Sequence, residues 1–137
     1  MTRPGQPGNQ MGYRYHKHYS RDEARALLPE IRLWLKRIAS LRETLEKYEQ
    51  RVAALMSGGN DVGGEAVNSW IRTLAELREV FCEFQKRDIQ IKDLDRGLID
   101  FPAVIAGREV FLCCEQDEED IEFWHDLDSG YAGRERL

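Results

Sequence analysis

The chain has 137 residues, of which 42 % are hydrophobic and 33 % are charged. This length provides one compact domain with a modest core and excludes large multidomain enzyme architectures. No apolar run approaches the ~18 residues of a membrane span, and the N-terminal residues lack the apolar stretch of a secretory signal. We therefore expect a cytoplasmic protein that does not enter a membrane.

Charge is distributed unevenly along the chain. The formal net charge is −5, and eight acids with no Lys or Arg lie between Glu115 and Asp128. Proteins that bind DNA or RNA usually concentrate Lys and Arg on one face, so nucleic acid is not an expected partner. The acidic segment is interpreted either as a solvated rim or as a site for a cation or a basic partner.

The N-terminal part of the chain is predicted to be irregular except for one short strand. Residues 1–12 are rich in Gly, Pro, Gln and Asn, a composition that cannot bury a core and predicts a disordered tail. Aromatic residues alternate over 13–19, which predicts a strand. Ser20 with Glu23 three residues later forms the capping box that begins a helix.

Heptad spacing predicts two long amphipathic helices. Apolar residues recur every three or four positions over 24–55 and again over 67–84, as in the seam of a coiled coil. The intervening segment SGGNDVGG contains four glycines and predicts a turn at 57–64. We therefore expect residues 20–88 to form a long antiparallel helical hairpin.

Two residues of this hairpin carry expectations of their own. Pro29 lacks a backbone N–H and clashes with the preceding turn, which predicts either a kink or a helix that ends at Leu28. Cys82 lies beside the second seam and is expected to be a small buried hydrophobe. The other two cysteines, Cys113 and Cys114, are adjacent in sequence, and all three thiols are expected to be reduced.

After the helices the hydrophobic period changes to two. The pair Ala106–Gly107 separates two β-rich runs, as a hairpin turn would. Residues 89–137 are therefore predicted to form a small β-rich C-terminal cap. The expected fold class is mainly α (α+β), a helical hairpin with this cap, in a single domain over residues 1–137.

One contact between helix and cap is also predicted. Arg25, Arg32 and Lys36 are spaced seven and four residues apart, so they share one helix face. We expect at least one carboxylate of residues 115–128 to lie within salt-bridge distance of these cations.

Several segments resemble a known family. The segments ALLPEIR, GLIDFP, G-x-x-V-x-L-C and WHDLDSGYAGR resemble an uncharacterised prokaryotic family catalogued as domain of unknown function 2203. The resemblance covers most of the chain from about Tyr15 onward. In the family pattern a Trp follows the cysteine and a Gly precedes an acid, whereas this chain has Cys114 and Asp117 there and keeps the acid as Glu118. The resemblance implies no particular activity.

Candidate functional residues lie in the C-terminal third of the chain. An imidazole beside carboxylates can act as a general base or bind a metal, and a mixed carboxylate and imidazole set suits zinc, iron or manganese. Glu118, His125 and Asp126 are the predicted metal ligands. A structural histidine and a turn-forming Asp100 are the alternatives. The whole candidate cluster is Asp100, Glu118, Trp124, His125, Asp126, Asp128 and Arg134.

Two functions fit these observations. The first is a non-enzymatic module for self-association or partner binding, because two long helices cannot shield each other on all sides. A homodimer is expected, and a separate protein partner is compatible with the same surface. The alternative is a small metal-dependent enzyme or metal-binding protein that uses the carboxylate and histidine site. The sequence contains no nucleotide-binding, nucleophile or hydrolase motif, which favours the first function. The self-association function rests on a second, weaker apolar stripe beside the seam of each predicted helix. These stripes contain Leu28, Leu35, Ala39, Ile71, Ala75 and Cys82.

Overall fold

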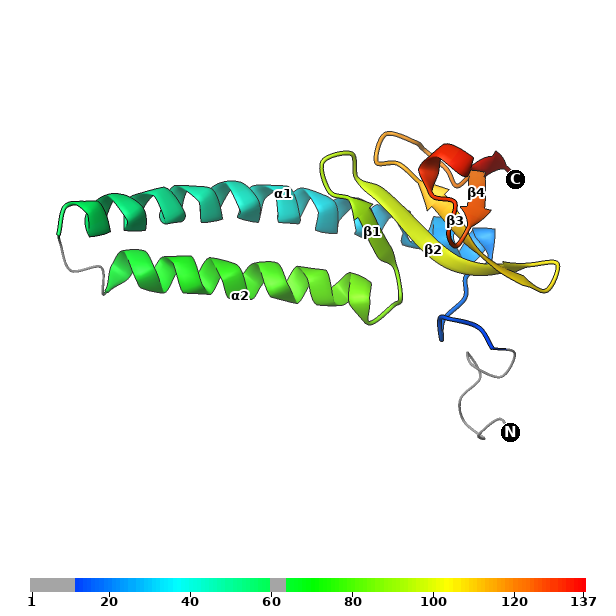
Figure 1. Cartoon of the computed structure of the whole chain (residues 1–137), viewed down its shortest axis with the longest axis horizontal. Helices are drawn as coiled ribbons and strands as arrows, with labels where there is room; N and C mark the ends of the chain where they lie inside the picture. The colour runs from blue at the N-terminus through cyan, green and yellow to red at the C-terminus, as the bar shows by residue number, and fades with distance from the viewer. Residues whose placement is uncertain (1–11, 60–63) are drawn as a thin grey trace. The chain divides into compact units, whose positions relative to one another are not determined.

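A computed structural model describes residues 12–59 and 64–137. Residues 1–11 of the predicted tail and residues 60–63 of the predicted glycine turn lie outside these residues. Two α-helices come first, and they are followed by strands and one short 3-10 helix (Figure 1). The elements are α1 (Arg21–Ser57), α2 (Glu65–Gln85), β1 (Gln90–Asp93), β2 (Leu98–Ile105), β3 (Arg108–Cys114), β4 (Phe123–Asp126), η2 (Tyr131–Gly133) and β5 (Glu135–Arg136).

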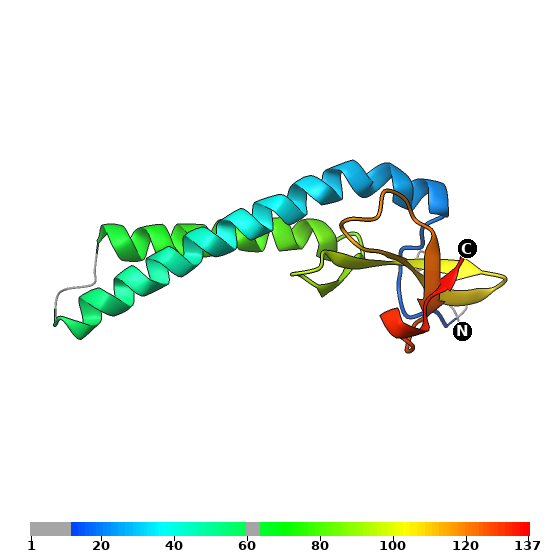
Figure 2. The same cartoon turned by 90° about the horizontal axis from the view of Figure 1, so that it is seen from above.

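The chain forms two compact units, and both boundaries between them fall inside helices. Leu33–Glu83 form the first unit, in which α1 and α2 run side by side in opposite directions (Figures 1 and 2). An ion pair from Arg37 to Glu76, 3.5 Å between Nη2 and Oε2, joins the two helices. The second unit, called the sheet unit below, contains the described residues up to Arg32 and those from Phe84 onward.

Helix α1 begins as the capping box predicts. The Ser20 hydroxyl accepts a hydrogen bond from the backbone N–H of Glu23, and the Glu23 carboxylate accepts one from the N–H of Ser20. The helix then runs without interruption through Pro29 to Ser57, so the predicted end at Leu28 is wrong. Leu28 and Ile31 are buried on either side of the proline, and this packing offsets the ~3 kcal/mol cost of proline inside a helix.

The buried stripe of α2 differs from the predicted seam by one position. Leu74 was expected in the seam but is 41 % exposed, whereas Thr73 and Val80 are buried. The spacing of apolar residues favours the frame that contains Leu74, whereas the structure buries the neighbouring frame, which includes the polar Thr73. Cys82 lies away from the buried stripe and is exposed, so its predicted burial is wrong. The stripe that the structure selects contains Ala66, Thr73, Val80 and Phe84.

The expectation of a small β-rich cap is also wrong. All five strands form one antiparallel sheet in the order β1-β2-β3-β4-β5, and β2 alone has eight residues. The fold is therefore α+β, with two long helices and a substantial sheet of five strands. The sequence did not indicate β4 because this short strand lies within the acidic segment, where charged neighbours obscure the alternation of apolar residues.

The N-terminal residues 13–19 do not form the predicted strand. Four of their backbone N–H groups instead donate to side chains of the sheet unit, and that of Tyr19 donates to the backbone carbonyl of Pro102 on β2. The N–H groups of Arg14 and Tyr15 donate to the Glu109 carboxylate, and those of His16 and Lys17 donate to Asp88. Two carboxylates thus replace a neighbouring strand as the hydrogen-bond acceptors for this segment.

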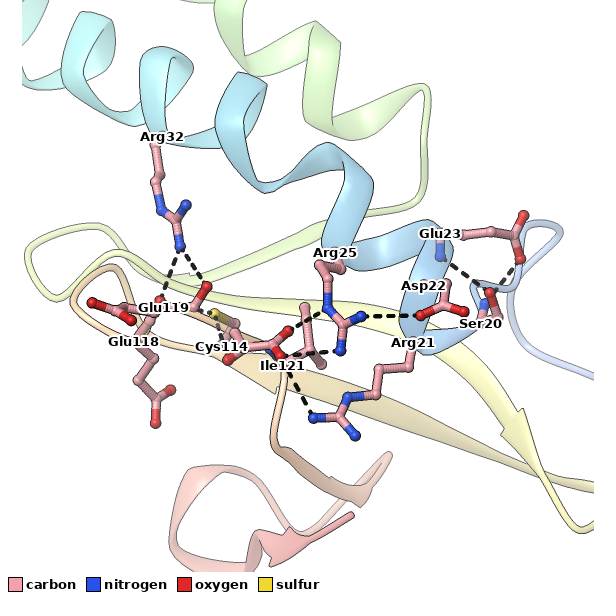
Figure 3. A network of polar contacts seen from close by, with 11 residues as sticks. Ser20, Arg21, Asp22, Glu23, Arg25, Arg32, Cys114, Glu118, Glu119 and Ile121 are labelled. Carbon is pink, nitrogen blue, oxygen red and sulfur yellow. Dashed lines mark hydrogen bonds and ion pairs between the residues drawn. The ribbon is translucent and has the colours of Figure 1, made fainter.

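The predicted contact between the acidic segment and the start of α1 is confirmed (Figure 3). The guanidinium of Arg25 donates to both carboxylate oxygens of Asp120, at 2.7 and 3.0 Å. Arg32 donates to the backbone carbonyls of Glu118 and Glu119, each at 3.1 Å. Exposed ion pairs stabilise a fold by only ~0.2–1 kcal/mol, so these contacts mainly orient the segment.

The predicted hairpin turn at Ala106–Gly107 is present. Both residues have positive φ, 52° and 77°, as in the type I′ turn that matches the twist of antiparallel strands. The turn sets the register of β2 and β3, in which Ile105 is opposite Arg108. An L-residue such as Ala106 is strained in this conformation, whereas Asn tolerates it.

We predict that Ala106→Asn stabilises the protein. The expected gain in the free energy of unfolding is about 0.5–1 kcal/mol, because Asn relieves strain at a positive φ. Urea unfolding would show the gain as a higher midpoint. As a control, the β-branched variant Ala106→Val should lower the midpoint. An Asn variant with an unchanged or lower midpoint would contradict this account of the turn.

Candidate functional site

One face of the sheet carries a cluster of buried polar side chains. Asp100 on β2 is opposite Cys113 on β3, and Phe111, two residues before Cys113, is opposite His125 on β4. Directly opposite residues project to the same side of a sheet, as do residues two apart on one strand. Asp100, Cys113 and His125 therefore share one face although they come from three strands.

Asp100 and His125 form a buried pair. Oδ2 of Asp100 lies 3.0 Å from Nε2 of His125, and each side chain is only 2 % exposed. The other ring nitrogen, Nδ1, lies 2.7 Å from the backbone carbonyl oxygen of Asp126. Because that carbonyl can only accept a hydrogen bond, Nδ1 carries a hydrogen and donates it.

The remaining ring nitrogen therefore points at a second acceptor. With Nδ1 protonated, a neutral His125 ring has a lone pair on Nε2, which faces the Asp100 carboxylate. Two acceptors 3.0 Å apart need a proton or a metal ion between them. Burial raises the pKa of the Asp100 carboxyl, and this effect exceeds the lowering by the nearby His125 and Lys92. In addition, Oδ1 of Asp100 is buried without a hydrogen-bond partner among the described residues.

Cys113 completes a group of three metal-ligating side chains. The ligand atoms of Asp100, Cys113 and His125 all lie within 4.8 Å of one another, and all three residues are buried. Burial and the Asp100 charge raise the pKa of the Cys113 thiol to about 12, although Arg134 acts in the opposite direction. Cys113 is therefore a thiol at neutral pH in the absence of a metal ion.

Arg134 packs beside this group. Its guanidinium lies 3.9 Å from the ring centroid of Phe123 and 4.2 Å from that of Tyr131. It also donates to Oε1 of Glu118 at 3.0 Å, and the two side chains are 16 % and 21 % exposed. This arrangement holds the C-terminal segment of the chain against the face of the sheet that carries Asp100.

The structure brings together only some of the predicted site residues. Asp100 and His125 are in contact. Arg134 lies beside Cys113 and pairs with Glu118. Glu118 is occupied by Arg134 and by the backbone N–H of Glu115.

The other predicted residues lie elsewhere. The Asp126 carboxylate pairs with Arg108, so only its backbone carbonyl serves the cluster. Asp128 pairs with Arg14 on the surface. Trp124 is opposite Leu112 and therefore projects from the other face of the sheet.

Sequence reasoning missed Cys113 as a site residue. A single thiol with no spaced partner does not indicate a metal site. The available signal was the predicted hairpin about Ala106–Gly107, since counting outward from that turn pairs Asp100 with Cys113.

Comparison with known proteins agrees with the resemblance in the sequence. The family model described as "Uncharacterized conserved protein (DUF2203)" matches residues 17–137. The chain belongs to this family. Neither the curated proteins nor the solved structures gave a match. Three of the four segments that carry the DUF2203 resemblance meet at the buried cluster: GLIDFP contributes Asp100, G-x-x-V-x-L-C ends at Cys113, and WHDLDSGYAGR contributes His125 and Arg134.

We predict that only one thiol of the folded protein reacts with an aromatic disulfide reagent at about pH 8. Cys82 is exposed, whereas Cys113 and Cys114 are buried, and the pKa of each buried thiol is raised to about 12. The release of chromophore would measure the number of reactive thiols. The variant Cys82→Ser should release none until it is unfolded. Rapid reaction of a second thiol in the folded protein would contradict the described burial.

Proposed function

We propose that this protein binds a divalent transition-metal ion through Asp100, Cys113 and His125. The observation that carries the proposal is the pair of acceptors, Nε2 of His125 and Oδ2 of Asp100, which face each other at 3.0 Å inside the protein. A bound ion would accept both lone pairs, and it would also give a partner to the buried Oδ1 of Asp100.

The ligand chemistry supports a transition metal. Carboxylate, thiolate and imidazole are zinc ligands, at bond lengths of ~2.0–2.3 Å, and tetrahedral geometry then needs donor atoms roughly 3.3–3.8 Å apart. The three donors already lie within 4.8 Å of one another. The thiolate favours zinc or iron over manganese. One carboxylate and one thiolate would also neutralise the charge of a divalent ion, which suits a buried site.

The surroundings of His125 match those of a metal-bound histidine. A ligating imidazole usually donates its second N–H to a carbonyl or carboxylate, which orients the ring. The carbonyl of Asp126 has this role here. Three protein ligands leave one position for water or a substrate, where a metal supplies Lewis-acid chemistry or an activated water.

We predict that the protein purified without chelator binds one equivalent of Co²⁺ or Zn²⁺. A thiolate ligand should give the cobalt-loaded protein an intense sulfur-to-metal absorption band. Metal at about 100 times its Kd should stabilise the folded state by about 2.7 kcal/mol. Elemental analysis, absorption and thermal unfolding measure these three effects. Wild-type protein that remains metal-free and shows no thermal shift would rule the proposal out.

Substitutions distinguish this site from the ligands predicted from the sequence. Cys113→Ser should abolish the sulfur-to-cobalt band, and His125→Gln should weaken metal binding. The matched controls Glu118→Gln and Asp126→Asn alter the other expected ligands and should retain the band. Circular dichroism of each variant shows whether it folds. A folded Cys113→Ser variant with the wild-type band would exclude Cys113 as a ligand.

Self-association is a second candidate function, and it has its own observation. Ile71 and Leu74 on α2 are 55 % and 41 % exposed, and Cys82 further along the helix is also exposed. Apolar residues at this spacing form a stripe that a second hairpin could cover in a four-helix bundle. This function concerns the unit formed by Leu33–Glu83, called the helical unit. It is therefore compatible with metal binding in the sheet unit.

We predict that the protein is a dimer at about 100 μM and that the double variant Ile71→Glu/Leu74→Glu is a monomer, because the dimer would bury both charges. Light scattering measures the mass of each. The control Val104→Glu adds a charge at an exposed position of the sheet and should leave the dimer intact. A wild-type protein with the mass of one chain would exclude self-association.

A further inference from the structure

We propose that the metal site binds a small anion bearing a carboxylate or phosphate group, which Lys92 and Arg134 contact. This inference rests on the proposed function, because the anion would occupy the open position of the bound metal. Lys92 and Arg134 would be the two cations that select this class of ligand.

The direction of the open position follows from the sheet. Asp100, Cys113 and His125 project from β2, β3 and β4 toward the same side. An ion held by these three side chains would lie on this face of the sheet, with the strands on one side of it. The fourth position of a tetrahedral ion therefore points away from the sheet, toward whatever covers this face.

Lys92 covers the face from one side. Lys92 lies on β1, and β1 pairs with β2. Its Nζ nevertheless lies 5.0 Å from the ring centroid of Phe111 on β3, so the side chain extends across β2, the strand that carries Asp100. The positive charge of Lys92 also acts on the Asp100 carboxyl. Lys92 makes no salt bridge with any carboxylate in the described part of the chain.

Arg134 covers the face from the other side. Its guanidinium stacks on Phe123, the residue of β4 that is opposite Cys113, and it acts on the Cys113 thiol. The Phe123 and Tyr131 rings hold the guanidinium plane in place. The guanidinium donates to Glu118 and to the Cys113 side chain. Arg has five N–H donors, so further donors remain for a ligand.

The charges around the open position favour an anion over a neutral ligand. Asp100 and Cys113 as thiolate would balance a divalent metal ion, and Glu118 balances Arg134. Once a metal ion balances Asp100, on which the charge of Lys92 acts, a bound ligand would provide the counter-charge for Lys92 at this site. An anion bound to the metal and to Lys92 would supply it, in a setting where charge-assisted hydrogen bonds are strong. Carboxylate and phosphate oxygens are ligands for the metal and acceptors for both cations.

The experiment uses the full chain loaded with Co²⁺, with inorganic phosphate and acetate as separate probes. Binding of an anion at the open position changes the geometry of the cobalt ion and hence its visible absorption. We expect a saturable spectral change with at least one probe. The probe with the tighter response distinguishes a phosphate ligand from a carboxylate ligand.

Two lysine variants test the role of the cation. Lys92 is exposed, so Lys92→Gln should fold and still bind cobalt, and its cobalt-loaded form is the one titrated with anion. It should weaken anion binding about tenfold, as expected for the loss of one charge-assisted contact. The matched control Lys47→Gln removes an exposed lysine of α1 in the helical unit and should leave anion binding unchanged.

The outcomes separate this inference from the proposed function. A cobalt-loaded protein whose spectrum responds to neither anion would overturn the anion site and leave metal binding intact. Equal anion affinity in Lys92→Gln and the wild type would likewise overturn it. If cobalt does not bind at all, the proposed function fails, and this inference fails with it.

Discussion

The register of β2 with β3 is the constraint on which the sheet unit depends. Seven residue pairs join these strands, from Ile99 with Cys114 to Ile105 with Arg108. A slip of one residue would move every side chain of a strand to the other face. In the observed register Phe101 is buried on one face beside Tyr19, and Asp100 is buried on the other beside Cys113. The same register therefore sets both the apolar core and the polar cluster.

A buried ionisable pair is poor evidence of stability by itself. The desolvation of two charged groups commonly costs as much as their attraction provides, and apolar residues of similar volume are often at least as stable. His125 and Asp100 nevertheless occupy the centre of the sheet face, with an unpartnered carboxylate oxygen among the described residues. The cation proposed above would satisfy these groups, whose burial is costly in its absence.

Local sequence signals predicted those features that depend on neighbours in the chain. The capping box at Ser20, the two helices and the turn at Ala106–Gly107 all follow from residues a few positions apart. The contact of Arg25 with Asp120 was also predictable, since only one segment of the chain offers so many acids to a helix face that carries three cations.

Features that depend on distant partners could not be predicted in this way. The stripe of α2 passes through Thr73 although Leu74 is the more apolar residue, because tertiary packing decides which face of the helix is buried. Residues 13–19 alternate like a strand, yet they bind carboxylates because no neighbouring strand pairs with them. The cluster of Asp100, Cys113 and His125 needs three strands in register, so its third member, Cys113, becomes evident only when the sheet is known.

The division of the chain into two units has a consequence for how its length can vary. The sheet unit is built from both ends of the described chain, and Leu33–Glu83 are inserted between them through the interiors of two helices. Adding or removing a heptad in each helix preserves the phase of a coiled-coil seam. The inserted hairpin can therefore change length during evolution while the strands that carry the buried cluster stay the same.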